Sequence, residues 1–304
     1  MAKENKKAVV TGGAGFIGSH LVDALVERGY EVHIIDNLSA GKKENVNPKA
    51  ILHIADICDY EAIAPIIAGA MYVFHLAALP RVQYSIEYPA ETNEVNVGGT
   101  VNVLKAAEKG GVKRVIYSAS SSAYGDQPKL PLTEDMPAMP KSPYGLQKYI
   151  GELYARMWSE IHGLSTVSLR YFNIYGPRYN AQGAYALVIG KFLEQRKRGE
   201  SMTITGDGKQ TRDFTSVRDA VRANIIAALH PHEFRGDVFN IGAGENFSVN
   251  QVAEFIGGPT EYIPARLEPH DTLADISKAK RGLGWEPQVR LTDGIAELKK
   301  IVGI

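Results

Sequence analysis

Several side chains of this sequence have the types and spacing needed to bind a dinucleotide and to move a proton. A glycine cluster, Gly13-x-Gly15-x-x-Gly18, lies between an apolar run and an amphipathic segment. Asp36 ends the next apolar run, about 20 residues beyond the last glycine. Tyr144 and Lys148 lie four residues apart, after the serine-rich residues 118–122. A phenol beside an ammonium can serve as a base, because a nearby positive charge favours the ionised phenol and lowers its pKa.

The glycine cluster and Asp36 together predict a site for NAD. One glycine permits a tight turn, one lets the backbone approach a pyrophosphate, and one lets helix and strand pack closely. The pyrophosphate would lie at the helix N-terminus, where N–H groups and the helix dipole favour negative charge. A carboxylate at Asp36 would accept hydrogen bonds from both ribose hydroxyls and would repel the 2′-phosphate of NADP. The alternative is an ordinary strand–turn–helix with a solvated aspartate.

These residues need an α/β fold to bring them together. The pattern predicts strands at 8–11, 31–35, 50–55, 71–78, 114–118, 166–172 and 237–242. A first helix is expected to open at the glycine cluster, with apolar Leu21, Val22, Leu25 and Val26. Further helices are expected at about 59–69, 88–109, 143–162, 218–229, from 249, and at 292–301. The helix at 143–162 starts well, with a Ser142 cap and Pro143. This alternation predicts a Rossmann-type, doubly wound parallel sheet with a smaller mixed α/β C-terminal substrate lobe. We expect residues 1–176 and about 214–243 in the NAD-binding domain, and about 177–213 and 244–304 in the lobe.

Bulk properties exclude several other classes of protein. The 304 residues carry 34 basic and 34 acidic side chains, so neither nucleic acid nor an anionic membrane is an expected partner. The single cysteine, Cys58, excludes an internal disulfide and a cysteine-based metal cluster, and the histidines show no ligand spacing, so no metal is expected. No apolar run approaches the length that a bilayer requires, and the N-terminus has no signal-peptide core. We expect a cytoplasmic protein.

Many ordered stretches resemble the extended short-chain dehydrogenase/reductase family. Within that family, the chain resembles the NAD-dependent nucleotide-sugar epimerases, especially those acting at C4 of UDP-glucose and UDP-N-acetylglucosamine. The matching stretches are 11–18, 36–38, 75–78, 96–100, 118–125, Tyr144-x-x-x-Lys148, 170–173, 206–208, 212–214 and 273–279. They extend over nearly the whole chain.

The resemblance implies roles for individual residues. Tyr144 would be the catalytic base, Lys148 would lower its pKa and hold the nicotinamide ribose, and Ser120 would be the catalytic hydroxyl residue. Asp56 and Ile57 would bracket the adenine. The remaining expected cofactor contacts are Gly12, Gly15, Phe16, Ile17, Gly18, Asp36, Asn37, Leu76, Ala77, Ala78, Asn96, Ser118, Tyr171 and Phe172. Besides Ser120 and Tyr144, the expected substrate contacts are Ser121, Asn173, Arg212, Arg266 and Thr272.

The resemblance also implies a reaction, 4-epimerisation of a UDP-sugar through a transient 4-keto intermediate. Related dehydratases carry Asp-Glu after the catalytic hydroxyl residue, and related decarboxylases carry Glu at the second position beyond it. Ser121 and Ser122 occupy these positions here, and a hydroxyl group cannot do the acid–base work of a carboxyl group near neutral pH. A uronate 4-epimerase, a dehydratase or decarboxylase, and a non-enzymatic NAD-binding regulator stay as alternatives.

Two further expectations concern assembly and substrate breadth. Members of this family commonly dimerise through a four-helix bundle, and the corresponding helices here are about 88–109 and 143–162. The second carries Ile150, Leu153, Tyr154 and Met157 at helical spacing. Thr272 falls at the position that limits room for the C2 substituent of the sugar. Because threonine is small, we expect the N-acetylhexosamine pair to be accepted alongside UDP-glucose and UDP-galactose.

Overall fold

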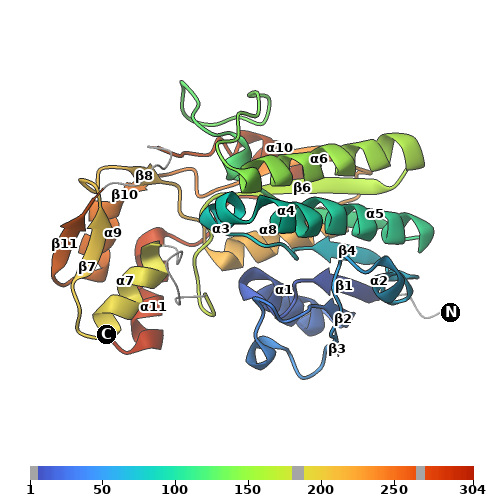
Figure 1. Cartoon of the computed structure of the whole chain (residues 1–304), viewed down its shortest axis with the longest axis horizontal. Coiled ribbons are helices and arrows are strands. Elements are labelled where there is room, and N and C mark those ends of the chain that lie inside the picture. The colour runs from blue at the N-terminus through green and yellow to red at the C-terminus, as the bar shows by residue number, and fades with distance from the viewer. Residues whose placement is uncertain (1–5, 180–187, 265–270) are drawn as a thin grey trace.

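The structure is a computed structural model that describes residues 6–179, 188–264 and 271–304. Figure 1 shows a larger part, with helices on both faces of a sheet, and a smaller lobe beside it. The sheet has seven strands in the order β3-β2-β1-β4-β5-β6-β9, and every neighbouring pair is parallel. The strand bounds are β1 Lys7–Thr11, β2 Glu31–Ile35, β3 Ile51–His53, β4 Tyr72–His75, β5 Arg114–Ser120, β6 Ser165–Tyr171 and β9 Arg235–Ile241. The predicted Rossmann-type architecture is confirmed.

Helices cover the two faces of this sheet. Helices α1 (Phe16–Glu27) and α8 (Val217–Leu229) pack against each other on one face. The other face carries α2 (Tyr60–Ile67), α5 (Thr100–Lys109) and α6 (Pro143–His162). Apolar side chains of the strands are buried against both layers, so two separate cores sandwich the sheet. The strand order reverses between β1 and β4, and open α/β sheets bind ligands at such a reversal.

The helix predicted at 88–109 differs in detail from the observed segment. Two short helices, α3 (Val82–Glu87) and α4 (Pro89–Asn93), come first, and the latter runs into a π-helical turn at Glu94–Gly99 before α5. A π-helical turn is wider than an α-helical turn and is frequent at functional sites. Here it contains Asn96, one of the predicted cofactor residues, with its side chain 2% exposed.

The smaller lobe has its own core. Helices α7 (Val188–Lys197), α9 (Val249–Ile256) and α11 (Leu291–Val302) pack around the pair β7 (Met202–Thr205) and β11 (Thr260–Ile263). A second small pair joins β8 (Thr211–Arg212) to β10 (Phe247–Ser248). Helix α9 begins with a capping box, in which Ser248 and Gln251 each accept from the other's backbone N–H.

One segment that we assigned to the lobe belongs to the larger part. Helix α10 (Ser277–Leu283) packs on β9, and Ala279, Leu283 and Trp285 lie in the main core. The indole of Trp285 is fully buried and donates to the Asp219 carbonyl at 3.0 Å. The chain therefore returns to the sheet once more before α11, so residues 244–304 do not form one continuous part of the lobe.

Candidate active site

The glycine loop between β1 and α1 has the close packing that its sequence predicts. Gly12 has φ +72°, and a Cβ there would lie 2.7 Å from the Ala77 nitrogen. A Cβ on Gly18 would lie 2.1 Å from the Gly12 carbonyl oxygen. Gly15 caps α1 without a side-chain hydrogen bond, so the N–H groups of the first turn stay available to a pyrophosphate. The loop thus fits a dinucleotide.

The predicted adenosine side lies at the ends of β2 and β3. The Asp36 carboxylate accepts from the backbone N–H groups of Ala14 at 3.0 Å and Leu38 at 2.8 Å. These bonds tie the end of β2 to the glycine loop and fix the orientation of the carboxylate. Asn37 donates to the Asp56 carboxylate at 2.9 Å, which brings two predicted adenosine residues together.

Asn96 and His75 brace the groove from its other side. The Asn96 amide exchanges two hydrogen bonds with the backbone of Leu79 and donates to Gln147 of α6 at 2.9 Å. The Asn96 amide therefore links the loop after β4, which carries Leu76, Ala77 and Ala78, to α6. His75 bridges Thr11 and Thr100 through its two ring nitrogens at 2.8 and 2.9 Å. Burial lowers the pKa of His75 to about 3, so this histidine is a neutral structural residue.

The three predicted catalytic residues lie at the C-terminal end of β5 and the start of α6. Ser142 caps α6 by accepting from Gly145 N–H, which places Tyr144 in the first turn and Lys148 one turn later. Ser120 ends β5, where its hydroxyl donates to Ser122 at 3.0 Å and hydrogen-bonds Tyr144. Lys148 is 4% exposed, and its Nζ donates to the Ser118 carbonyl oxygen at 2.8 Å. The predicted hydroxyl, phenol and ammonium therefore converge.

The expected lowering of the Tyr144 pKa by Lys148 is not produced by the protein groups alone. Burial raises the pKa of Tyr144 to about 12, and only the Ser120 hydrogen bond opposes it. The Lys148 ammonium is directed towards Ser118 and lies 5.0 Å from the ring centre of Tyr117. Burial lowers the pKa of Lys148 to about 8. A Tyr144 base therefore needs a further positive charge at the site.

Two other predicted cofactor residues on β6 and just after it face opposite ways. The Tyr171 hydroxyl hydrogen-bonds Ser118 at 3.2 Å and accepts from Asn224 of α8 at 2.6 Å. Phe172 is fully buried in a small cluster with Tyr124, Leu132 and Ala274. The Phe172 ring is therefore part of the core, and its contact with a nicotinamide stays a prediction.

Three of the predicted substrate residues meet across the lobe boundary. Asn173, with φ +33°, donates from Nδ2 to the Asp213 carbonyl at 2.9 Å and lies 3.5 Å from the Thr272 hydroxyl. Arg212 directly precedes Asp213 and donates to the Thr211 carbonyl. Arg266 lies outside the described residues. The predicted Asn173, Arg212 and Thr272 thus come together from three separate segments.

Asp213 holds these segments and was not predicted as a site residue. Its side chain is fully buried and accepts from the backbone N–H groups of Ala243, Gly244 and Ala274 at 2.6, 3.1 and 3.1 Å. Burial raises the pKa of Asp213 to about 6, although these bonds act in the opposite direction. Gln147, which supports Asn96, was also missed. Gln147 bonds Thr92 and Asn96 of the neighbouring helical segment, and no local pattern marks such a partner.

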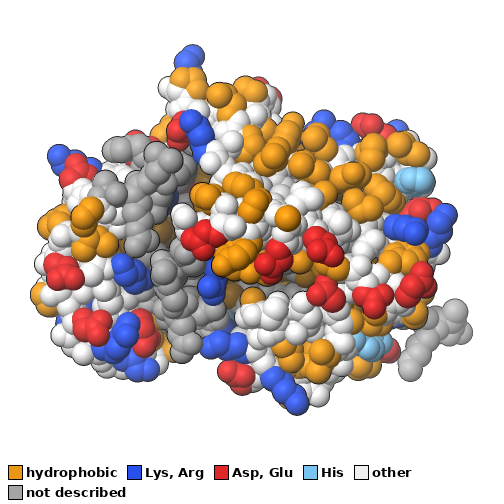
Figure 2. Space-filling model, viewed as in Figure 1, with side chains coloured by type: hydrophobic (Ala, Val, Ile, Leu, Met, Phe, Trp, Pro, Cys, Tyr) orange, Lys and Arg blue, Asp and Glu red, His pale blue; other side chains and the backbone are white. Residues whose placement is uncertain are grey.

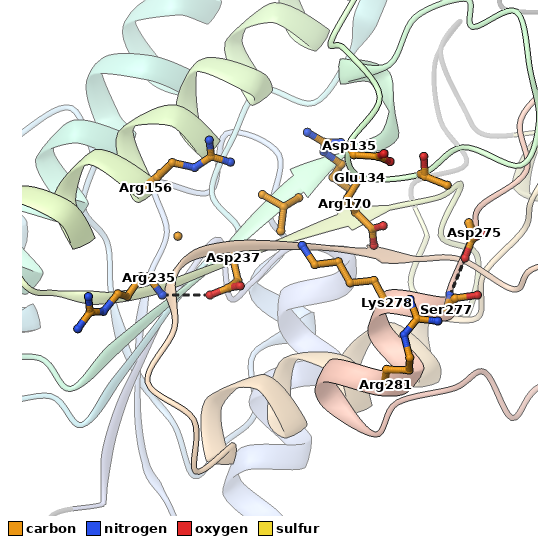
Figure 3. Close-up of a pocket in the computed structure, with 13 residues that line it drawn as sticks. Glu134, Asp135, Arg156, Arg170, Arg235, Asp237, Asp275, Ser277, Lys278 and Arg281 are labelled. Carbon is orange, nitrogen blue, oxygen red and sulfur yellow. Dashed lines mark hydrogen bonds between the residues drawn. The ribbon is translucent and has the colours of Figure 1, made fainter.

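A charged cavity of about 660 Å³ lies elsewhere, at the outer edge of β9 (Figure 3). Side chains from α6, β6, β9, α10 and the loop at 133–135 line it. Arg156, Arg170, Glu134 and Lys278 are among them. None of the predicted site residues in the described part of the chain lines this cavity, so it is separate from the reaction centre.

Two classes of site find no support in the structure. Among residues 6–179, 188–264 and 271–304, no three His, Cys, Asp or Glu side chains are grouped so that they could hold a metal ion. Within the same ranges, no helix combines the length and the apolar character needed to cross a membrane.

The parallel sheet, the glycine loop and the convergence of Ser120, Tyr144 and Lys148 define a dinucleotide-dependent enzyme of the α/β class. Residues 8–242 match the model of the NAD dependent epimerase/dehydratase family, and the chain belongs to that family, whose cofactor is NAD. The predicted family and cofactor are confirmed.

Relatives with solved structures or curated names agree with this assignment. The UDP-glucose 4-epimerase of Mycolicibacterium smegmatis is 37% identical over 306 residues, which cover 96% of each chain. The structure of a Thermotoga maritima UDP-glucose 4-epimerase with UDP-glucose has a TM-score of 0.92 at 40% identity and covers 97% of this chain and 99% of its own. A UDP-N-acetylglucosamine 4-epimerase from Methanobrevibacter ruminantium, in complex with UDP-N-acetylmuramic acid, has a TM-score of 0.91 at 36% identity and covers 98% and 100%.

Proposed function

We propose that the chain is an NAD-dependent UDP-sugar 4-epimerase. The observation that carries this proposal is the Ser120–Tyr144–Lys148 convergence, followed by serines rather than carboxylates at positions 121 and 122. Relatives named as UDP-glucose 4-epimerases match along almost the full chain, which supports the same chemistry. The physiological pair would be UDP-glucose and UDP-galactose, with the N-acetylhexosamine pair also accepted.

The residues of the site divide the proposed reaction among them. The Tyr144 oxygen takes the proton of the C4 hydroxyl, and the Ser120 hydroxyl stabilises the same oxygen by a hydrogen bond. When bound, NAD would supply a positively charged nicotinium ring and the acceptor for the C4 hydride, which goes back to the sugar within the same cycle. Lys148 would hold the nicotinamide ribose. The 4-keto sugar turns over between the two transfers, so the product differs from the substrate at C4.

A dehydratase or a decarboxylase would need a carboxyl group beside the reacting sugar. Ser121 and Ser122 instead form a short 3₁₀ turn after β5, and Ser122 Oγ accepts from Ser120. A serine hydroxyl does not ionise near neutral pH, so it cannot protonate a leaving hydroxyl. A UDP-glucuronate 4-epimerase shares the same opening step and is the second candidate.

Incubation of the purified protein with UDP-glucose, UDP-N-acetylglucosamine and UDP-glucuronate separately, followed by product separation, tests the proposal. We expect the C4 epimer of the first two sugars and no net change in oxidation state. Acid extraction of the protein should release NAD, because Asp36 repels the 2′-phosphate of NADP. A 4-keto-6-deoxy product or a pentose product would assign the protein to the other branches of the family. NADP as the dominant nucleotide would contradict the role of Asp36.

We also propose that two copies pair in the cytoplasm through a four-helix bundle, to which each copy contributes α6 and the helical segment at about 88–109, with α3 beside them. Leu146, Leu153, Met157 and Ile161 follow one face of α6 and are 47%, 42%, 38% and 67% exposed. Val82 and Ile86 of α3 add to this apolar surface. Figure 2 shows hydrophobic side chains gathered on the face where α6 lies in Figure 1. A second copy would remove these side chains from water.

Light scattering at micromolar concentration should give a dimer mass, and Leu153→Glu with Met157→Glu should give a monomer. A monomeric parent would exclude the pairing.

A further inference from the structure

The sheet-facing side of α6 carries a row of ionisable groups that the proposed reaction uses only in part. Tyr144, Lys148, Glu152 and Arg156 follow one another at intervals of four residues, so they lie along one side of the helix. Lys148 and Glu152 are 4% and 3% exposed. Glu152 has no part in the steps described above. A carboxylate buried to this extent must be compensated by a partner.

Arg170 of β6 is the partner of Glu152. Its Nε and Nη2 donate to the two carboxylate oxygens at 2.9 and 2.7 Å, which is a bidentate pair. Burial acts to lower the pKa of Arg170, but the hydrogen bond and the charge of Glu152 outweigh it and raise the pKa. The guanidinium also stacks 4.5 Å from the ring centre of Tyr124, at the wall of the charged cavity in Figure 3. Burial raises the pKa of Glu152, and the hydrogen bonds and charge of Arg170 act in the opposite direction. The bidentate pair therefore fixes the Glu152 carboxylate in place.

The Lys148 ammonium lies in a pocket where Glu152 is the compensating charge. The groups that act on it are the Ser118 carbonyl and the Tyr117 ring of β5, His75 of β4, and Glu152 one turn further along α6. Among the residues that the structure describes, Glu152 is the only carboxylate that acts on Lys148. His75 is neutral, and burial raises the pKa of Tyr117 and Tyr171, so these groups supply no negative charge near neutral pH.

This arrangement has a consequence for the reaction centre. Burial alone favours a neutral amine at position 148, and the pKa of about 8 includes the opposing effect of Glu152. If the carboxylate were removed, Lys148 would lose its proton closer to neutral pH. A neutral Lys148 would neither favour the ionised Tyr144 nor donate all of its hydrogen bonds to Ser118 and a ribose.

We propose that Glu152 is a positioning residue for Lys148, and that Arg170 holds the Glu152 carboxylate so that the ammonium stays charged and aligned at the reaction centre. This inference rests on the proposed function, because it assigns Lys148 a part in that reaction. A purely structural pair that joins α6 to β6 would have a different signature. Its loss would lower stability and would leave the pH dependence of turnover unchanged.

The test compares pH profiles of kcat for epimerisation of UDP-glucose between about pH 6 and pH 10. Glu152→Gln keeps the size of the side chain and removes its charge, and Glu152→Asp keeps the charge. The matched control is Asp219→Asn in α8. Asp219 is also buried, at 1% exposed, and its carboxylate lies 2.8 Å from the Arg222 guanidinium. This pair is remote from the reaction centre. The double variant Glu152→Gln/Arg170→Gln avoids leaving an unpaired buried guanidinium if the single variant does not fold.

We expect the alkaline limb of the Glu152→Gln profile to move to lower pH by about one unit, because Lys148 loses its proton earlier. The double variant should move in the same direction, Glu152→Asp should restore most of the parent profile, and Asp219→Asn should lower the melting temperature without moving the limb. A reduced kcat with an unmoved limb in both Gln variants would overturn the inference. An equal shift in Asp219→Asn would overturn it as well.

A second measurement does not depend on turnover. Isotope-labelled lysine followed by NMR, with the Lys148 signal assigned from a Lys148→Arg variant, reports the protonation of Nζ directly. The Lys148 signal should titrate at lower pH in Glu152→Gln than in the parent protein. An unchanged titration would overturn the inference even if the protein epimerises UDP-sugars. Absence of epimerase activity together with a shifted titration would instead contradict the proposed function.

Discussion

The cofactor side and the substrate side of the proposed site are built in different ways. On the cofactor side, Asp36, Asp56, Leu76 and Ser118 lie at or just beyond the ends of parallel strands or within their last residues, and some bonds there are short-range, such as Leu38 N to Asp36. On the substrate side, Asn173 reaches partners 40 and 99 residues away in the chain. The first half is set by local turns, whereas the second exists only where distant segments meet. Changes to the two halves should therefore have different effects.

The largest effect is expected where the two sides meet, at Tyr144. Tyr144→Phe keeps the ring and removes the oxygen that Ser120 bonds, so turnover should fall by roughly 10²–10⁴-fold while NAD stays bound. Steady-state kinetics with UDP-glucose and the NAD content of the purified protein measure the two quantities. Tyr154→Phe, on the same helix, serves as the control and should leave turnover close to that of the parent. Turnover of Tyr144→Phe within a few-fold of the parent would remove Tyr144 from its proposed role.

The next effect tests whether the cofactor half is set by local packing. Gly12→Ala places a Cβ 2.7 Å from the Ala77 nitrogen at φ +72°, so the loop must move and NAD binding should be lost. Gly69→Ala is the matched control, because Gly69 has φ +70° but a Cβ added there would meet no atom within 4 Å. The control should lower the free energy of unfolding in urea by about 1–2 kcal/mol, which is the cost of the left-handed conformation, and should keep NAD. If both variants keep NAD equally, close packing of the glycine loop is not what binds the dinucleotide.

A smaller, selective effect is expected on the substrate side at Thr272. Thr272→Tyr should reduce epimerisation of UDP-N-acetylglucosamine at least about tenfold more than that of UDP-glucose, because the larger ring crowds the C2 substituent. Since the Thr272 hydroxyl also accepts from the backbone N–H of Asp213 at 3.4 Å, Thr272→Val separates lost bonding from added bulk. Thr272→Val should affect both sugars alike. Equal losses on both sugars in Thr272→Tyr would show that this residue does not limit the pocket.

The smallest effect is on the pH dependence of stability. His75 on the cofactor side and Asp213 on the substrate side contribute to it with opposite signs. The folded pKa of His75, about 3, is below its unfolded value, so its contribution to stability is present above about pH 6.5 and is lost as the pH falls towards 3. The folded pKa of Asp213, about 6, is above its unfolded value of 3.8, so its contribution is present at low pH and is lost as the pH rises through about 6. Between about pH 4 and 6 the two effects oppose each other.

Melting temperatures between about pH 4 and 7 measure this balance. His75→Gln removes the protonation cost and should flatten the loss of stability on acidification. Asp213→Asn removes the opposing contribution and should make that loss steeper. If the two variants change the slope in the same direction, the contrast between the two halves is wrong.

Sequence patterns predicted the cofactor half more completely than the substrate half. The glycine loop, Asp36 and the start of α6, which carries Tyr144 and Lys148, have structures that depend on neighbours within one turn or one strand. The local residue types therefore predict these structures. The π-helical turn at Glu94–Gly99 was not predicted, because its periodicity differs little from that of an α-helix over so few residues. Phe172 was expected at the cofactor, yet strand alternation and packing with Tyr124 place its ring in the core.

The sequence by itself determined the parallel α/β class and the dinucleotide loop, and it placed the proposed catalytic residues Ser120, Tyr144 and Lys148 at the end of one strand and the start of one helix. Each follows from backbone geometry and side-chain chemistry within a short stretch. Only the tertiary structure decided that Asp213 joins three segments through backbone N–H groups, that α10 returns to the main core, and that Arg170 fixes Glu152 beside Lys148. Each of these contacts joins residues far apart in the chain, and no local pattern encodes the partner of a buried charge. Burial in the folded protein, rather than residue type, sets the pKa values of Tyr144 and Lys148.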